Sequence, residues 1–302
     1  MAPKLILGLV LGLGSSVIWG GHAVVARAAL SGQGLVPLDL AAFRYSIAAL
    51  VLLPLLWRGR QALARIGAWR LAVMTLLGGA PNLLLFVGAL VYAPATHGGT
   101  IAPMTVPVVG ALLAVPLLRE IPTPGRWAAL AAMAAGVLLI GWDGIAGDAP
   151  GAWRGDLMLL AAGSSWGAFT VLLRRWQVPA MAGTAAVTAL SALFVLPIWL
   201  PWRGADVMAM PAGVVLPHLL AQGLFLGAAA MFLYARAVEL LGATRASTLS
   251  VIVPVVALIL AAFVLAEPIG VLQLLGAALA VGGMGAAVLF TGRGPPKGSE
   301  KR

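Results

Sequence analysis

The tetrapeptide Val-Pro-Val-Val at Val106–Val109 returns 147 residues later at Val253–Val256. The other features that share this shift are Trp19-Gly20 with Trp166-Gly167, Arg27 with Arg174, Glu120 with Glu267, and Gly136 with Gly283. A fixed spacing of this kind is the signature of an internal repeat. We therefore divide the chain into a first copy at residues 1–146, a second copy at 147–291 and a basic tail at 292–302.

The composition indicates that the solvent of this chain is the lipid bilayer. Of its 302 residues, 62% are hydrophobic and 9% are charged, and the mean hydropathy is +1.04. Soluble globular proteins are roughly 45–50% apolar and about 25% charged. Soluble enzymes, secreted modules and disordered chains are therefore disfavoured. Because the chain has no cysteine, disulfides and thiolate metal sites are excluded.

Ten stretches are long and apolar enough to cross a membrane, which takes about 20 residues. They are Leu5–Ala26, Leu38–Trp57, Leu71–Val91, Gly98–Leu118, Arg126–Trp142, Leu157–Leu173, Met181–Trp199, Pro211–Tyr234, Ala246–Ala266 and Ile269–Phe290. The apolar runs do not alternate with period two, so strands are disfavoured. We predict an all-α polytopic membrane protein with ten transmembrane helices.

The distribution of charge predicts the orientation. With the N-terminus in the cytoplasm, 15 of the 19 Lys and Arg residues lie on the cytoplasmic side, as the positive-inside rule requires. The four exceptions are Arg27, Arg44, Arg154 and Arg203, and the opposite face carries Asp39, Asp143, Asp148, Asp156, Asp206 and Glu267. Topology thus accounts for the net charge of +10 without a nucleic-acid partner. Both termini are expected to be cytoplasmic.

Each copy contains five spans, and an odd number inserts the second copy upside down relative to the first. Inverted repeats of this kind build many secondary transporters, whose substrate site lies near the middle of the bilayer between the repeats. The pattern predicts alternating access by two related states, one open to each side.

Several motifs together resemble the ten-span EamA-type branch of the drug/metabolite transporter superfamily. They are Ser16–Gly20, Ala41–Tyr45, Ala89–Ala95, Pro107 with Leu118–Glu120, Trp166-Gly167, Tyr234–Glu239, and Pro254 with Leu265–Pro268. The resemblance covers nearly the whole chain. It implies a multi-pass carrier of the bacterial inner membrane, usually an exporter of amino acids or related metabolites. It further implies a central cavity lined mainly by spans one, three, four, six, eight and nine. Arg44 departs from the internal repeat, because its counterpart in the second copy is Ser191.

Aromatic residues and a histidine in spans one and six are candidates for substrate contact. Trp19 and His22 lie about one turn apart and share a helix face. Trp166, Phe169 and Thr170 are spaced to form a matching wall in span six. The alternatives are a histidine bonded to a neighbouring helix and tryptophans at the membrane interface.

Polar residues in spans three and eight are further candidates. Asn82 follows Pro81, which would kink span three, and Phe86 lies one turn on. Asn82 and Gln222 both donate and accept hydrogen bonds. They suit a zwitterionic or amide-bearing substrate, or they join helices structurally.

Spans four and nine supply a set of residues related by the repeat. Thr100, Met104 and Pro107 in span four correspond to Ser247, Val251 and Pro254 in span nine, where Ser250 is also a candidate. The paired prolines, as gating elements, would break their helices and turn carbonyls toward the substrate. The alternative is a structural kink.

Charged residues in or near the spans have either a structural or a gating role. Arg44 either attracts a substrate carboxylate or reaches the interface and pairs with Asp39. We favour the pairing with Asp39, which is a structural role. Arg27 and Arg174 are interfacial anchors or gate residues. Glu120 and Glu267 end their spans, and we expect solvent around them.

No Asp or Glu falls at a predicted midplane. Two mechanisms are therefore open: ion coupling through His22, or transport without strong ion coupling. We expect no catalytic residue, metal site or cofactor, because His22, His97 and His218 lack metal-ligand spacing. A selective channel is disfavoured, because the symmetry is internal. The partners expected are a small-molecule substrate and the bilayer, with the protein a monomer or weak homodimer. The alternative function is efflux of hydrophobic or cationic drugs or lipid-linked molecules, which predicts a lateral opening.

Overall fold

The computed structural model describes residues 2–146, 151–241 and 249–289, and within these ranges all regular structure is helical. Nine helical segments in the described ranges are long and apolar enough to cross a membrane. The expected ninth span, Ala246–Ala266, starts outside the described residues, and its described part contains a helix of 13 residues. The prediction of an all-α polytopic membrane protein is confirmed.

The first copy contains seven helical segments. They are α1 (Ala2–Gly20), α2 (His22–Leu30), α3 (Pro37–Ile66), α4 (Ala68–Gly78), α5 (Ala80–Ala89), α6 (Ala95–Leu118) and α7 (Pro124–Ala146). Spans one and three are each divided into two helices, at Gly21 and at Gly79. Gly79 precedes Pro81, so the helix is interrupted close to the predicted kink. The backbone N–H of Ala80, which has no partner within its helix, donates a hydrogen bond to Ser191 Oγ, with 3.0 Å between N and Oγ.

The second copy continues with nine described segments. They are α8 (Trp153–Arg175), α9 (Ala180–Trp199), η1 (Leu200–Gly204), α10 (Ala205–Ala209), α11 (Ala212–Leu219), η2 (Leu220–Ala229), α12 (Ala230–Leu241), α14 (Ile252–Val264) and α15 (Val271–Leu289). Segments η1 and η2 are π-helical. Insertions of this type are frequent at functional sites, and η2 carries Gln222.

The prediction that paired prolines break spans four and nine is wrong for span four. Helix α6 runs without interruption through Pro103, Pro107 and Pro116. Pro254 is the third residue of α14, in the first turn, where a missing backbone N–H costs little. Span four is therefore intact at the repeated Val-Pro-Val-Val motif, whereas in span nine Ser250 and Val251 form a turn and α14 begins two residues before Pro254.

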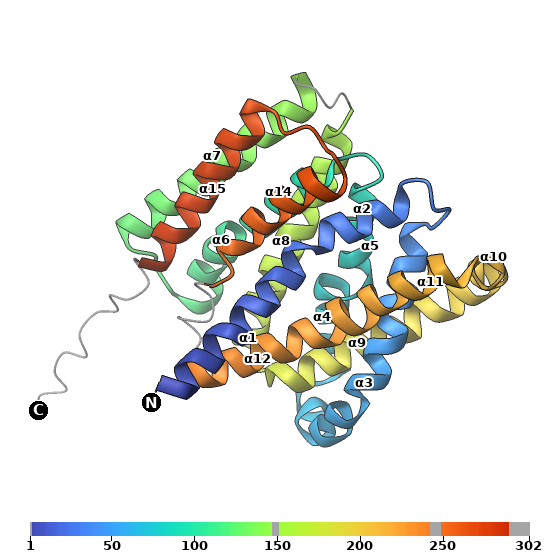
Figure 1. Cartoon of the computed structure of the whole chain (residues 1–302). Coiled ribbons are helices and arrows are strands. Elements are labelled where there is room, and N and C mark those ends of the chain that lie inside the picture. Colours follow the sequence, from blue (N-terminus) through green and yellow to red (C-terminus); the bar gives the residue numbers. More distant parts are fainter. Residues whose placement is uncertain (1, 147–150, 242–248, 290–302) are drawn as a thin grey trace, which may run out of the picture.

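Helices α7 and α15, which are repeat equivalents, run antiparallel along one edge of the bundle (Figure 1). Gly136 lies against Gly276 and Ala280, and Gly283 lies against Ala129 and Met133. Each contact maps onto the other when the two copies are exchanged. Antiparallel packing of equivalent helices means that the two copies are inverted, as the odd number of spans predicted.

The same exchange relates contacts elsewhere in the bundle. In the second equivalent pair, α3 and α9, Asp39 reaches Trp199 while Gly59 lies against Ala182, so these helices are also antiparallel. Gly20 of α1 approaches Val253 and Val256, and Gly167 of α8 approaches Val106 and Val109 in the equivalent way. Valines of the repeated Val-Pro-Val-Val motif thus pack against the glycine of the Trp-Gly pair in the other copy.

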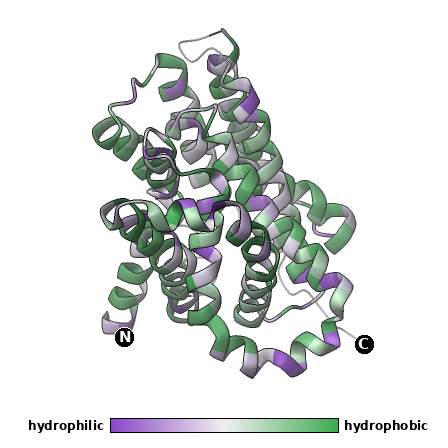
Figure 2. Cartoon of the chain, turned by 90° about the vertical axis from the view of Figure 1, so that its right-hand side faces the viewer, coloured by the Kyte–Doolittle hydropathy of each residue, from purple (hydrophilic) through white to green (hydrophobic). Residues whose placement is uncertain are grey.

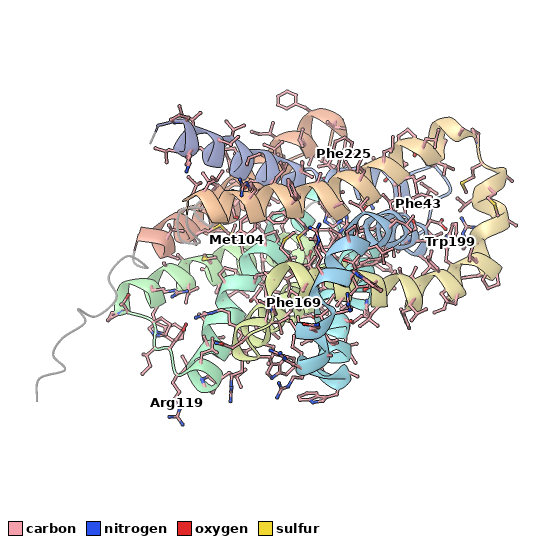
Figure 3. The ribbon with its side chains drawn as sticks, turned by 90° about the horizontal axis from the view of Figure 1, so that it is seen from below. Phe43, Met104, Arg119, Phe169, Trp199 and Phe225 are labelled. Atoms are coloured by element: carbon pink, nitrogen blue, oxygen red, sulfur yellow. The ribbon has the colours of Figure 1, made fainter. Side chains whose placement is uncertain are left out.

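The two ends of the bundle differ in charge. Helix α1 begins and α15 ends at one end, which we call the basic end (Figure 1). At the opposite, acidic end lie Asp39, Asp143, Asp156 and Glu267. Hydrophobic residues make up most of the ribbon (Figure 2). Met104 lies inside the bundle, whereas Arg119 projects from the basic end (Figure 3).

Candidate functional site

Four candidate residues from four different segments lie near one another between the repeats. Arg44 of α3 donates a hydrogen bond from Nη2 to Oε1 of Gln222 in η2. The His22 ring at the start of α2 stacks on the Phe86 ring of α5, with 4.5 Å between centroids and 13° between planes. Arg44 is also the charged side chain that acts electrostatically on His22. We call His22, Arg44, Phe86 and Gln222 the Arg44 cluster.

The depth of the Arg44 cluster follows from helix geometry. Arg44 is the eighth residue of α3 counted from the acidic end, and Gln222 is the eleventh residue of the segment that starts at Ala212. At about 1.5 Å per residue these positions lie roughly 10–15 Å inside the bundle. A hydrocarbon core is about 30 Å thick, so the cluster lies in the half toward the acidic end.

The Arg44 cluster has an excess of hydrogen-bond donors. Arg44 Nε and Gln222 Nε2 are buried and have no hydrogen-bond partner, and the same is true of His22 Nε2. Within the described ranges no carboxylate lies within 4 Å of Arg44. The expected pairing of Arg44 with Asp39 is wrong, because Asp39 is fully buried and bonds Arg203 and Trp199 instead.

An ion pair joins α2 to the segment after α14 at the acidic end. Arg27 Nε of α2 lies 3.9 Å from Glu267 Oε1, and Arg27 Nη1 donates to the backbone oxygen of Leu90. The Glu267 carboxylate accepts the backbone N–H groups of Ala95 and Thr96 at 3.0 and 3.3 Å. A carboxylate at this place satisfies free donors in the first turn of α6 and interacts favourably with the helix dipole. The expectation that Glu267 is simply solvated is therefore wrong.

The equivalent ion pair lies at the basic end. Arg174 Nη1 lies 3.1 Å from Glu120 Oε2 in a two-pronged contact. The side chains of this pair are 57% and 50% exposed, whereas those of Arg27 and Glu267 are 30% and 14% exposed. The residue before each glutamate, Arg119 or Ala266, adopts a left-handed conformation. The repeat thus places one Arg–Glu pair at each end, and the pair at the acidic end is the more enclosed.

The remaining aromatic candidates make their ring contacts with residues outside the Arg44 cluster. Trp19 contacts Tyr234, with 5.2 Å between ring centroids. Trp166 contacts Phe169 at the same separation. Phe169 is buried against Gly78 and belongs to a hydrophobic core. The predicted wall of span six is therefore partly core packing.

Most remaining polar candidates bond to backbone groups. Asn82 donates to the Ala162 oxygen at 2.7 Å, which is the helix-joining alternative. Thr100 bonds within α6, and Met104 is fully buried beside it. Thr170 bonds to Gly167. Thr170 also lines, with Pro107, Glu120 and Arg174, a pocket of about 190 Å³ at the basic end. The Ser250 backbone oxygen accepts the N–H of Val253, and Ser247 lies outside the described residues.

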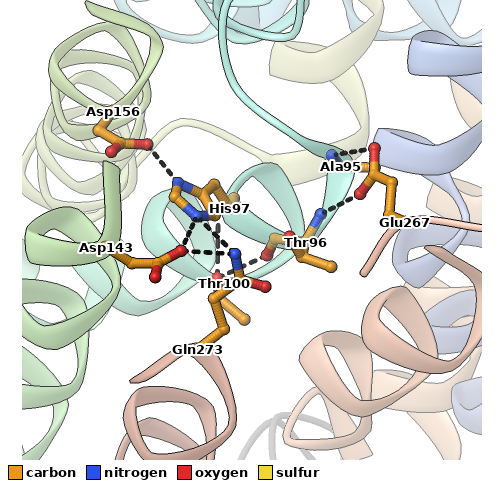
Figure 4. Close-up of polar contacts among 8 residues, drawn as sticks. All are labelled: Ala95, Thr96, His97, Thr100, Asp143, Asp156, Glu267 and Gln273. Carbon is orange, nitrogen blue, oxygen red and sulfur yellow. Dashed lines mark hydrogen bonds and ion pairs between the residues drawn. The ribbon is translucent and has the colours of Figure 1, made fainter. Parts of the chain in front are cut away.

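A buried polar network at the acidic end was not expected from the sequence. His97 Nδ1 lies 2.8 Å from Asp156 Oδ1, and His97 Nε2 lies 3.6 Å from Asp143 Oδ2 (Figure 4). Gln273 Nε2 lies 2.7 Å from the same Asp143 oxygen. The four residues come from α6, α8, α7 and α15. Hydropathy assigned both aspartates to a loop. The one signal in the sequence was that each lies next to the end of a predicted span, where neighbouring helices can cover it.

A lateral groove of about 760 Å³ lies along α6, α7 and α8. Its lining is almost wholly apolar and includes Leu138, Trp142 and Trp153. Asp156 is also among the lining residues. In the described part of the chain no group of three or more His, Asp or Glu side chains is arranged to hold a metal ion.

Comparisons with known proteins agree with this architecture. The model of the EamA-like transporter family matches the chain twice, at residues 6–142 and 153–289. The Bacillus subtilis (strain 168) protein "Uncharacterized transporter YwfM" is 28% identical over 276 residues, which cover 89% of this chain and 90% of that protein. "Uncharacterized transporter YetK" of the same organism is 26% identical over 287 residues, covering 92% and 83%. A crystal structure shares the fold with a TM-score of 0.63 and 22% identity, over 95% of this chain and 99% of that chain.

Proposed function

The chain belongs to the EamA-like transporter family, and from that premise we propose that it carries a small metabolite with a carboxylate group, such as an amino acid, by alternating access. The protein is a multi-pass membrane transporter, and a purely enzymatic role has no support in its family. The single observation that carries the substrate class is Arg44, an intramembrane cation that has no carboxylate within 4 Å in the described ranges.

The chemistry of the Arg44 cluster favours an anionic group on the substrate. An ionised side chain inside the membrane is costly unless it is paired or lines a polar route. Arg44 Nε and Gln222 Nε2 are unpartnered donors, and a carboxylate has two oxygens that accept from such donors. Phe86, stacked on His22, supplies an apolar surface for the rest of a small molecule.

The two Arg–Glu pairs support alternating access as the mechanism. They occupy equivalent positions in inverted copies, so exchanging the conformations of the copies exchanges the two ends. The enclosed pair at the acidic end and the exposed pair at the basic end fit a state closed at the acidic end and looser at the basic end. In the alternate state the Arg174–Glu120 pair becomes the enclosed one.

The orientation and the membrane are part of the proposal. We place both chain termini in the cytoplasm and the acidic end outside, in a bacterial inner membrane, with net export as the direction. The positive-inside rule supports this orientation, because the basic end holds most of the Lys and Arg residues. Fusion reporters at the two termini test it, and a terminus on the outer side contradicts it.

Binding measured in nanodiscs tests the substrate class. The twenty amino acids and small mono- and dicarboxylic acids are screened by thermal shift, and hits are then followed as flux in proteoliposomes. A charge-assisted hydrogen bond contributes about 1.5–3 kcal/mol, so Arg44→Gln lowers the affinity roughly 10- to 150-fold. Arg60→Gln is the matched control, because this exposed arginine stacks on Trp57 outside the cluster. Equal affinities in the two variants refute the proposal.

The lateral groove favours a second candidate, the efflux of hydrophobic or cationic molecules. Its volume of about 760 Å³ and its tryptophans suit an amphiphilic cation that enters from the lipid. Gly141 lines the groove, and a Cβ atom there meets nothing within 4 Å, so Gly141→Leu fills the groove without a clash. Loss of cationic dye binding in this variant, with no effect of Arg44→Gln, favours the second candidate over the first.

A further inference from the structure

The buried network of His97, Asp143, Asp156 and Gln273 contains more acidic than basic groups, so a bound proton would balance its charge. All four residues are less than 5% exposed. In the described ranges the only basic side chain within 4 Å of Asp143 or Asp156 is His97. With a neutral imidazole, the network therefore buries two carboxylates and no cation. Buried charges persist only when they are paired and hydrogen-bonded, so the imidazolium form is the natural counter-ion.

The geometry allows His97 to take up a proton without moving a helix. In the neutral ring, Nδ1–H donates to Asp156, while the Gln273 amide, 3.2 Å from Nε2, donates to that nitrogen. The second hydrogen of the same amide goes to Asp143 Oδ2. In the imidazolium, Nε2–H points to Asp143 Oδ2, 3.6 Å away, and the Gln273 amide turns aside. The neutral ring is hydrogen-bonded at both nitrogens, and the imidazolium is hydrogen-bonded to Asp156 and ion-paired with Asp143.

The network is also short of donors. Asp156 Oδ2 and Gln273 Oε1 are buried acceptors that have no hydrogen-bond partner. Each added proton supplies a donor to a group of atoms that consists mostly of acceptors. The imbalance is opposite to that of the Arg44 cluster, where the unpartnered atoms of Arg44 and Gln222 are donors. The two clusters therefore attract different ligands.

From this arrangement we propose that His97, Asp143 and Asp156 form a proton-binding site whose occupation stabilises the closed acidic end. The inference rests on the proposed function only in assuming that this end opens. His97 is two residues from Ala95, whose backbone N–H is bonded by Glu267. The proton site and the Arg27–Glu267 closure therefore share the first turn of α6.

The charged groups around His97 determine the direction of the effect. Asp143 faces it from α7, Asp156 from α8 and the polar Gln273 from α15, while Glu267 and its partner Arg27 lie at the N-terminus of α6. Opening the acidic end brings water to the carboxylates and weakens their attraction for the imidazolium. The closed form thus binds the proton more tightly, and acid favours closure.

The test measures proton binding without any substrate. The chain contains three histidines, so ¹⁵N-histidine labelling of the protein in nanodiscs gives few signals, and His97→Gln assigns the one of interest. Spectra are recorded between pH 5 and 9, and the proposal predicts that the His97 ring-nitrogen signals change with pH. In the Asp143→Asn/Asp156→Asn variant this pH-dependent change moves or disappears. A His97 signal that stays unchanged over this range overturns the proposal.

A second readout separates proton binding from a purely structural role. The melting temperature of the wild type is expected to vary with pH in part through this site, and His97→Gln removes that part. A structural role lowers the melting temperature equally at every pH, so parallel curves for wild type and variant overturn the proposal. His218→Gln is the control, because His218 bonds Gln33 away from the network.

Closure itself is measured between spin labels at Ala28→Cys and Pro268→Cys, which flank the Arg27–Glu267 pair. Because the chain has no native cysteine, labelling is specific. Lowering the pH is expected to enrich the short distance, and His97→Gln to abolish that response. A response retained in His97→Gln overturns the proposal while leaving the transport function open to the substrate screen.

Discussion

Adding one methyl group at Gly283 tests the inverted packing of α7 against α15. A Cβ atom at this position lies 2.7 Å from Met133 Cγ, 2.8 Å from the Ala129 oxygen and 3.0 Å from the Met133 nitrogen. Two of these three atoms belong to the backbone, so a side-chain rotation cannot relieve the overlap. Gly283→Ala therefore forces the two helices apart, and overpacking of this kind costs about 1–3 kcal/mol.

The neighbouring Gly282 provides a matched control. A Cβ atom there meets nothing within 4 Å, so Gly282→Ala leaves the packing unchanged. The better helix propensity of alanine changes the free energy of unfolding by at most about 1 kcal/mol in the stabilising direction. The two substituted positions are adjacent in α15, but the side chain at 282 would point into open space and the side chain at 283 toward α7.

The repeat makes the same prediction at the equivalent glycine. A Cβ atom at Gly136 lies 2.5 Å from the Gly276 oxygen and 2.9 Å from the Ala280 nitrogen, both backbone atoms. Gly136→Ala is therefore expected to destabilise the protein at least as much as Gly283→Ala. Reversible unfolding by SDS in mixed micelles, followed by circular dichroism, measures the free energies. Equal stabilities of the Gly282→Ala and Gly283→Ala variants refute the packing.

Other contacts give shorter predictions. Ser191→Ala leaves the backbone N–H of Ala80 without its acceptor and costs about 1–3 kcal/mol in the same unfolding assay; an unchanged stability contradicts that hydrogen bond. Asn82→Ala removes a bond between helices and lowers stability by about 0.6–2 kcal/mol, whereas a loss of binding without a loss of stability would assign Asn82 to the substrate. Reversing one charge by Arg174→Glu is expected to reduce transport, and adding Glu120→Arg to restore it, with stability changed by less than about 1 kcal/mol because the pair is exposed; no rescue in flux measurements contradicts the gating role.

The architecture was predictable because its determinants are local and repeated. Small residues mark close helix approach, and the shift that overlays Gly136 on Gly283 also exchanges their contacts in the structure. Hydropathy located the spans because a membrane helix is apolar over its whole length. The break near Pro81 was predicted from local chemistry, since proline prevents a helical hydrogen bond.

The partners of charged residues were not predictable in the same way. The sequence shows that Arg44 is intramembrane, but its partner depends on how α3 rotates against η2 and α9. In the structure Gln222 faces Arg44, and Asp39 turns to Arg203. Gln222 lies 178 residues from Arg44, and Arg203 lies 164 residues from Asp39. Local sequence spacing cannot indicate contacts between residues so far apart in the chain.

The burial of acidic residues near the ends of the spans was not predictable for a related reason. A hydropathy profile treats Asp143 and Asp156 as loop residues, because each lies close to the end of its apolar run. Helices α6 and α15 cover them, and the burial comes from this tertiary contact. Only the packing of the four helices identifies His97 as their common partner.

Coupling between the two ends of the bundle tests the central claim most directly. Spin-label distances are measured at the acidic end, between Ala28→Cys and Pro268→Cys, and at the repeat-equivalent basic end, between Arg175→Cys and Ile121→Cys. Glu267→Gln, which weakens the closure at the acidic end, is the perturbation. Alternating access predicts that the acidic-end distance lengthens while the basic-end distance shortens in the same sample. A longer acidic-end distance with an unchanged basic end contradicts the account.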